Sequence, residues 1–168
     1  MIDIDAIKKL DVSPPLIAFT SFLCQEKGVH SFPDYQKLDL MKIPRLVPCI
    51  WVIDFRKGID GGLLFHFSGT AMDRQYGYNI TGHTWEDCYA GDHREKVLDH
   101  CFRKVYLEKK IGFTRRKDRF ISDNLNKYRK IEALLFPCSQ DDDHINFGIG
   151  ITHFSPADDE VDSVYTAI

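Results

Sequence analysis

The chain has 168 residues, of which 43% are hydrophobic and 28% are charged, and its formal net charge is -3. These values are typical of one globular domain with a substantial core, and a weakly negative chain has no general attraction for nucleic acid or acidic membranes. No apolar run is long enough for a transmembrane helix, and the acidic N-terminus does not resemble a secretory signal, so we expect a cytoplasmic protein with neither nucleic-acid nor membrane partners.

The N-terminal part contains one clear helix signal. We expect residues 1–12 to form a loosely held arm, Ser13 to cap a helix that starts with two prolines, and Gly28 to end it. The helix is apolar on more than one side, so it must pack on a sheet or form a dimer, and a homodimer through it is expected. We assign residues 1–30 to this arm and amphipathic helix.

Two strands are predicted next, at 50–55 and 63–68, with the Asp60-Gly61-Gly62 reversal between them. Because side chains alternate along a strand, the first strand presents apolar residues on both faces, which indicates a central strand covered on both sides. The residues expected to share one face are Trp51, Ile53 and Phe55, and those on the other are Ile50 and Val52.

A helical block follows. A short helix is expected at 70–76 and ends at Gly77, and Thr84 is expected to cap a second short helix. Asp92 is the expected cap of a long helix at 93–110, which Gly112 closes.

Three further strands are predicted at 113–120, 128–136 and 145–154. In the last strand, Gly148 and Gly150 alternate with apolar residues and permit close approach by a helix or ligand. Residues 155–168 are acidic, and we expect a frayed tail. The order of elements predicts an α+β fold, in which helices lie on one face of an antiparallel sheet and the N-terminal helix lies on the other face or at an edge.

Four sequence motifs occur in a fixed order: residues 43–48 (IPRLVP), 65–70 (FHFSGT), 76–82 (YGYNITG) and 132–137 (EALLFP). In that order they resemble the lead-in, the second strand, the glycine exit and the penultimate strand of the PAS domain, in particular of a bacterial stand-alone PAS family (the PAS_5 type). The resemblance implies a five-stranded antiparallel sheet with a helical block on one face, over residues 31–154. It also implies a sensory or interaction domain that is not an enzyme.

The expected site is an apolar pocket between the sheet and the helical block, which would hold a small apolar or aromatic ligand. Its candidate walls are Trp51, Ile53, Phe65, Phe67, Met72, Tyr76, Leu98, Phe102, Leu135 and Ile149. The protein would signal to a partner protein of unknown identity. Two alternatives remain open: these aromatic residues form a plain core in a ligand-free interaction and dimerisation module, or the chain is a small α+β enzyme.

Metal and cofactor chemistry has little support in the sequence. The five cysteines are scattered without a CxxC pair, and His93 and His100, although on one side of the expected long helix, are typical of a cap and a surface residue. We expect no haem, flavin or metal, because ligand spacing and nucleotide-binding loops are missing.

Half of the lysines and arginines, eleven of 22, lie between residues 103 and 130. Arg115, Lys117 and Arg119 would share one strand face. The simplest interpretation is a solvated hairpin whose basic side chains protect a sheet edge, and the alternative is a surface for an anionic partner.

Overall fold

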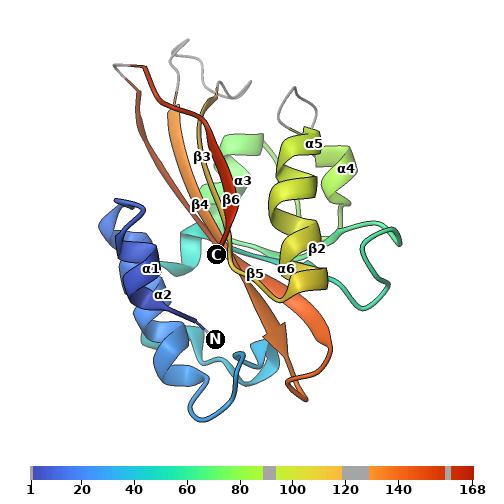
Figure 1. Ribbon diagram of the computed structural model, residues 1–168. Helices are drawn as coiled ribbons and strands as arrows, with labels where there is room; N and C mark the ends of the chain where they lie inside the picture. The colour runs from blue at the N-terminus through green and yellow to red at the C-terminus, as the bar shows by residue number, and fades with distance from the viewer. Residues whose placement is uncertain (1, 89–93, 119–128, 158–159) are drawn as a thin grey trace.

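The computed structural model describes residues 2–88, 94–118, 129–157 and 160–168, and it has an α+β fold built on an open antiparallel sheet (Figure 1). The α+β class and the antiparallel sheet are thus confirmed, but the sheet has six strands, in the order β2-β1-β5-β4-β3-β6, rather than five. The strands are β1 Ile50–Asp54, β2 Leu64–Ser68, β3 Gly112–Asp118, β4 Arg129–Ser139, β5 Ile145–Pro156 and β6 Val164–Ala167.

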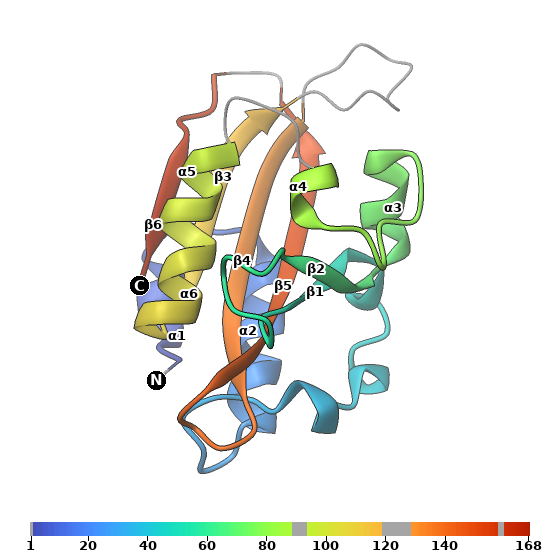
Figure 2. The same ribbon diagram turned by 90° about the vertical axis from the view of Figure 1, so that its right-hand side faces the viewer.

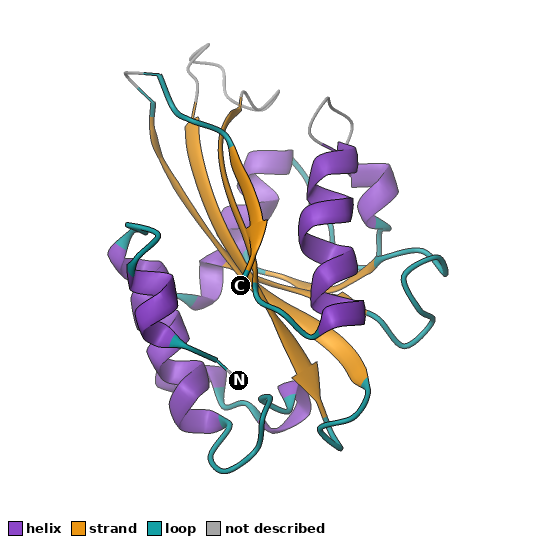
Figure 3. Ribbon diagram, in the orientation of Figure 1, coloured by secondary structure: helices purple, strands orange, loops and turns teal. Residues whose placement is uncertain are grey.

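Helices cover both faces of this sheet, as Figures 1 and 3 show. One face carries α1 Ile4–Lys8 and α2 Pro14–Glu26, and the other carries α3 Thr70–Tyr76, α4 Trp85–Cys88, α5 Arg94–Val97 and α6 Arg103–Glu108. A π-helical segment, Leu98–Phe102, joins α5 to α6 in one long helix. Short 3-10 helices at Tyr35–Lys37, Leu40–Lys42 and Val47–Cys49 lead into β1. None of the helices in the described ranges has the length and apolar character needed to cross a membrane.

Strands β1 and β5 pair with each other in the interior of the sheet, so β1 is an inner strand, as its two apolar faces indicated. Trp51 lies opposite Gly150 and Ile53 lies opposite Gly148. Each glycine therefore leaves room on the helical-block face for a bulky neighbour, which explains why two glycines are tolerated in a buried strand.

The two faces of the sheet bury two separate cores. Under α1 and α2, the fully buried side chains include Leu16, Phe19, Leu23, Ile50, Val52, Leu134, Phe136, Ile149 and Ile151. Under α3 to α6, the buried side chains include Trp51, Ile53, Phe55, Phe65, Met72, Trp85, Phe102 and Leu135. The predicted division of β1 between its two faces is confirmed.

Both ends of the chain are more ordered than the sequence predicted. Residues 4–8 form α1, where the Asp3 carboxylate accepts hydrogen bonds from the first-turn amides and Ile7 is fully buried. In the expected tail, β6 pairs with β3 and covers its edge. These elements have five and four residues, which is too short for a periodic apolar pattern to reveal them.

Several predicted helix boundaries need correction. Ser13 precedes α2 but does not cap it, because its hydroxyl instead donates to the Glu132 carboxylate. The long helix ends at Lys109, whose φ of 56° is left-handed, whereas Gly112 begins β3. Gly77 does end α3, with φ 82°, and the Thr84 hydroxyl accepts from the Asp87 amide as an N-cap should. The expected cap at 92 and His93 lie outside the described residues.

Helix α2 packs on the sheet face opposite the other helices. Leu16, Phe19 and Leu23 are fully buried there, and the Phe19 ring meets Phe136 edge-on with ring centres 5.8 Å apart. The apolar surface that suggested dimerisation is therefore largely covered within one chain. The homodimer through this helix stays a prediction.

Replacing Phe19 by alanine should lower the free energy of unfolding by about 3–5 kcal/mol, because a fully buried ring leaves a cavity. Met41→Ala is the control, since Met41 is 77% exposed and a surface truncation should change stability by less than about 0.5 kcal/mol. Urea unfolding followed by circular dichroism measures both. Equal, small losses would contradict the packing of α2 on the sheet.

Candidate functional site

A cavity lies between the sheet and the helical block, and its floor is formed by the cavity-facing residues of β3, β4, β5 and β1. Strand pairing aligns these residues in rows, because partners in neighbouring strands lie side by side. The first row is Gly112, Leu135 and Trp51, whose indole covers Gly150. The second row is Thr114, Ala133 and Thr152, and the third is Arg116, Ile131 and Phe154. The middle row therefore has a small residue between two hydroxyls.

The roof of the cavity comes from the helices. In Figure 2 the long helix and α4 lie in front of the sheet, and α3 lies to one side of it. The roof includes Met72, Tyr76, Trp85, Val97, Cys101 and Phe102, and Phe65 of β2 closes one side. The cavity volume is about 50 Å³. A water molecule needs roughly 10–15 Å³ and a cavity that holds benzene measures about 150 Å³, so this space suits a very small molecule unless the walls move.

Most of the predicted pocket residues meet at this cavity. Its walls include Trp51, Phe65, Met72, Tyr76, Phe102 and Leu135. Ile53 and Leu98 belong to the same core but do not line the cavity. Phe67 and Ile149 lie in the other core, on the face that α2 covers, so their predicted place in the pocket is wrong.

The backbone register explains why Phe67 and Ile149 do not face the cavity. The β1–β2 pairing shifts between Val52 and Ile53, so that Val52 faces Phe67 while Ile53 faces Phe65. This β-bulge adds one residue to β2, and because side chains alternate, it moves Phe67 to the opposite face. Ile149 alternates with the two glycines of β5, and the glycines, not the isoleucine, face the helical block.

The sequence interpretation missed the polar residues of the cavity: Thr114, Arg116 and Thr152. The alternation that groups Arg115 with Lys117 also turns Thr114 and Arg116 to the opposite face. The alternation was visible in the sequence, but the many basic residues of 103–130 suggested a solvated hairpin. The prediction of solvent exposure is wrong for Arg116, because only 6% of the residue is exposed.

Arg116 brings a positive charge to an otherwise largely apolar cavity. Its Nε lies 3.5 Å from an Asp118 carboxylate oxygen, and its Nη1 lies 3.5 Å from Thr114 Oγ1. Asp118 is at the end of β3 and is 35% exposed, so its charge is partly hydrated. The guanidinium therefore extends from the strand end to a hydroxyl of the cavity floor.

Trp51 is held by one hydrogen bond and one close packing contact. Its indole Nε1 donates to Thr152 Oγ1 at 2.9 Å, and both residues are buried. The indole lies directly over Gly150, where any Cβ would overlap its ring atoms. The glycine thus determines how deeply the tryptophan sits on the sheet.

Among the described residues that line the cavity, no nucleophilic side chain is paired with a base. Burial raises the pKa of Cys101 to about 12, so this thiol stays protonated and is a poor nucleophile. His100, the histidine considered for haem, is exposed. Among the described residues, no cluster of histidine, cysteine and acidic side chains could hold a metal ion.

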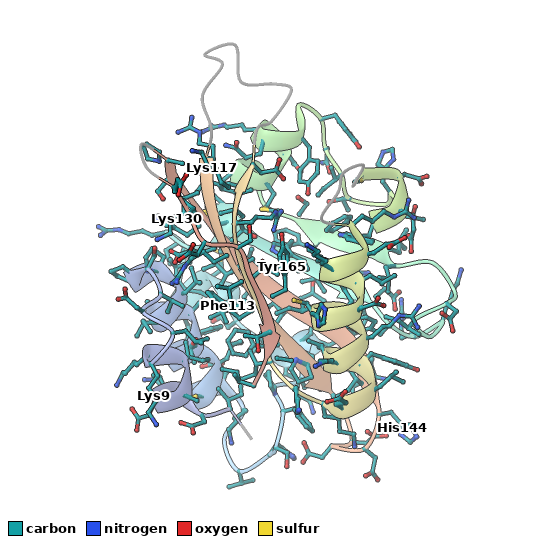
Figure 4. The ribbon with its side chains drawn as sticks, turned by 45° about the horizontal axis from the view of Figure 1, so that its top comes forward. Lys9, Phe113, Lys117, Lys130, His144 and Tyr165 are labelled. Carbon is teal, nitrogen blue, oxygen red and sulfur yellow. The ribbon has the colours of Figure 1, made fainter. Side chains whose placement is uncertain are left out.

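On the opposite face, a buried carboxylate ties the N-terminal segment to the sheet. Glu132 is 1% exposed and accepts from Arg115 Nε at 2.9 Å, from the Ser13 hydroxyl, and from nearby Lys130 at 3.3 Å. Arg115 Nη2 also donates to the carbonyls of Leu10 and Asp11 at 2.8 and 2.7 Å. In Figure 4, Lys130 lies beside Lys117, its partner on β3.

The pKa of Glu132 is set by opposing effects. Burial raises it, but the hydrogen bonds from Ser13 and Arg115 and the charge of Lys130 outweigh burial, and the pKa is lowered from its ordinary 4.5. The carboxylate is therefore ionised in the native state at neutral pH.

No protein-family model matches this chain, and no curated protein matches it significantly in sequence.

Gly150→Ala should displace the Trp51 indole, change the tryptophan fluorescence and lower stability by about 1–3 kcal/mol, the usual range for overpacking. Gly148→Ala is the matched control, because it lies on the same face of β5 but its Cβ would meet Phe55 at 2.7 Å and Leu135 at 2.9 Å. It should destabilise the protein with a smaller change in emission. Unchanged fluorescence in Gly150→Ala would contradict the contact.

Glu132→Gln should lower the free energy of unfolding at pH 7 by about 3 kcal/mol. This is near the lower end of the loss expected when a buried ion pair is broken, because Lys130 is partly hydrated. Since the native pKa is lowered, the stabilisation is present above the unfolded value near 4.5 and is lost as pH falls through the native pKa.

Urea unfolding between pH 7 and pH 3 checks this expectation. The variant should lack part of the acid-induced loss that the wild type shows below about pH 4.5. Glu108→Gln is the control, because Glu108 is exposed and its contact with Lys110 is at the surface. An identical pH profile in Glu132→Gln and the wild type would refute the role of the carboxylate.

Proposed function

We propose that this chain is a sensory domain of the PAS type, which takes up a small molecule between its sheet and helical block and passes the change on through protein–protein contacts. The observation that carries this proposal is the cavity itself. It occurs where the sequence predicts a pocket, and its walls are mostly apolar with a few polar groups, as in small-molecule sites.

The fold supports the same proposal. The resemblance to PAS domains implies an antiparallel sheet with a helical block on one face. An antiparallel sheet with α3 to α6 on one face is compatible with that implication. Helices α1 and α2 and strand β6 would then be additions around that unit.

A small molecule changes the protein only if it binds two conformations with different affinity. The roof offers such a conformational element. Cys101 and Phe102 reach the cavity from the π-helical segment, and π-helical turns inside α-helices often occur at functional sites. A ligand larger than the present 50 Å³ would push on this segment and so move the long helix.

A ligand-free interaction module is the second candidate. The observation in its favour is the small size of the cavity and the aromatic packing around it. Trp51 and Phe102 have ring centres 6.0 Å apart, and Trp85 and Phe102 have centres 5.1 Å apart. A small α+β enzyme is the least supported candidate, because the described residues that line the cavity include no nucleophile paired with a base.

Native mass spectrometry of freshly purified protein separates these candidates. The sensor should retain a small molecule, and Ala133→Val, which adds two methyl groups to the cavity floor, should lose it. Because an open space accepts added volume, this variant should cost less than about 1 kcal/mol of stability, whereas overpacking a filled core costs about 1–3 kcal/mol.

Ala18→Val is the matched control, since Ala18 is exposed on α2. It should keep the bound molecule. The interaction module would be favoured by two results together: the wild-type protein shows only the mass of its chain, and Ala133→Val lowers the free energy of unfolding by more than roughly 2 kcal/mol.

A further inference from the structure

The polar end of the cavity groups three hydrogen-bond donors around one small residue. Ala133 of β4 lies between Thr114 of β3 and Thr152 of β5, and Arg116 follows two residues after Thr114 on the same face. Directly opposed residues in neighbouring strands have Cβ atoms about 4.5–5.5 Å apart. The two hydroxyls and the guanidinium therefore lie around Ala133 at the polar end of the cavity. Figure 2 shows β3, β4 and β5 side by side.

Both hydroxyl oxygens face donors from the protein. Thr152 Oγ1 accepts from the Trp51 indole at 2.9 Å, and Thr114 Oγ1 lies 3.5 Å from Arg116 Nη1. A threonine hydroxyl has one proton of its own to donate. With their oxygens oriented as acceptors toward these groups, both threonines can donate to an acceptor inside the cavity.

Arg116 contributes a guanidinium to the cavity lining, and the residue is 6% exposed. The Asp118 carboxylate supplies a negative charge near Arg116 at the end of β3. The planar guanidinium carries five donors, so it can bind more than one acceptor at once. A carboxylate has the shape and charge that such a fork binds best.

We propose that the ligand of this cavity is a small carboxylate with a short apolar tail. Its carboxylate is bound by Arg116, Thr114 and Thr152, and its tail lies against Trp51 and Phe102. This inference rests on the proposed function and specifies its ligand. The cavity of about 50 Å³ is smaller than one that holds benzene, so a carboxylate with a tail of a few carbon atoms fits only when the roof moves.

The wild-type protein alone provides a test. Both tryptophans of the chain, Trp51 and Trp85, line the cavity, so their fluorescence reports on it directly. Sodium butyrate should shift the emission in a saturable way and raise the melting temperature. Butyramide, which has the same size but no charge, should bind roughly ten- to a hundredfold more weakly, because it lacks the charge-assisted hydrogen bonds.

Two variants locate the anion. Arg116→Gln should weaken butyrate binding by roughly ten- to a hundredfold, to the level of butyramide. Lys117→Gln removes the same charge from the next residue, which faces the other side of β3, and should leave butyrate binding unchanged. If Arg116→Gln does not fold, the comparison of butyrate with butyramide in the wild type still shows whether the cavity prefers a carboxylate.

Equal affinity for butyrate and butyramide, or wild-type butyrate affinity in Arg116→Gln, would overturn the carboxylate assignment. So would the lack of any response to butyrate. These outcomes differ from a failure of the sensor proposal, because a retained neutral molecule in native mass spectrometry would leave small-molecule binding intact while excluding the carboxylate.

Discussion

The central constraint on this fold is that β1 and β5 are covered on both faces, so each of their large buried apolar side chains belongs to one of two cores. Alternation along each strand makes that assignment, and a shift of one residue reverses it. Trp51 enters the core beneath α3 to α6, whereas Val52 enters the core beneath α2. Small residues line the cavity floor on the helical-block face, namely Gly112, Ala133, Thr114 and Thr152, whereas the α2 face receives large apolar side chains.

The same alternation gives two neighbouring arginines different roles. Arg115 points toward the N-terminal segment and pairs with Glu132, while Arg116 lines the cavity. Both belong to β3, and Glu132 and Ala133 repeat the division on β4. Because protein interiors are close-packed, a displacement of β3 or β4 caused in the cavity would also reach the Glu132 contacts with Ser13 and the segment before α2. The two cores are thus connected through two strands.

Much of the fold could be predicted because its strands and longer helices carry strong patterns. The two-sided apolar character of β1 predicted its central position, and Gly77 predicted the end of α3. Elements of four or five residues, α1 and β6, were missed, since pairing with β3 and burial of Ile7 depend on contacts distant in sequence. The bulge that turns Phe67 away depends on pairing with β1, which the sequence of β2 does not reveal.

The candidate site was predicted in its apolar part and missed in its polar part. Aromatic residues near the corner of β2 and α3 indicated a pocket, but basic residues in a hairpin indicated solvent exposure. Arg116 is buried because β6 covers the edge of β3 and the long helix covers its face, and both depend on tertiary structure. The charge pattern alone could not separate Arg116 from the solvated basic residues around it.

The most direct measurement is a crystal structure of the wild-type protein grown with butyrate. The account predicts density for butyrate inside the cavity, with its carboxylate beside Arg116 and Thr114 and its tail toward Trp51. A cavity that holds only water at saturating butyrate, or one closed by the side chains of its roof, would contradict the account and favour a filled-core interaction module.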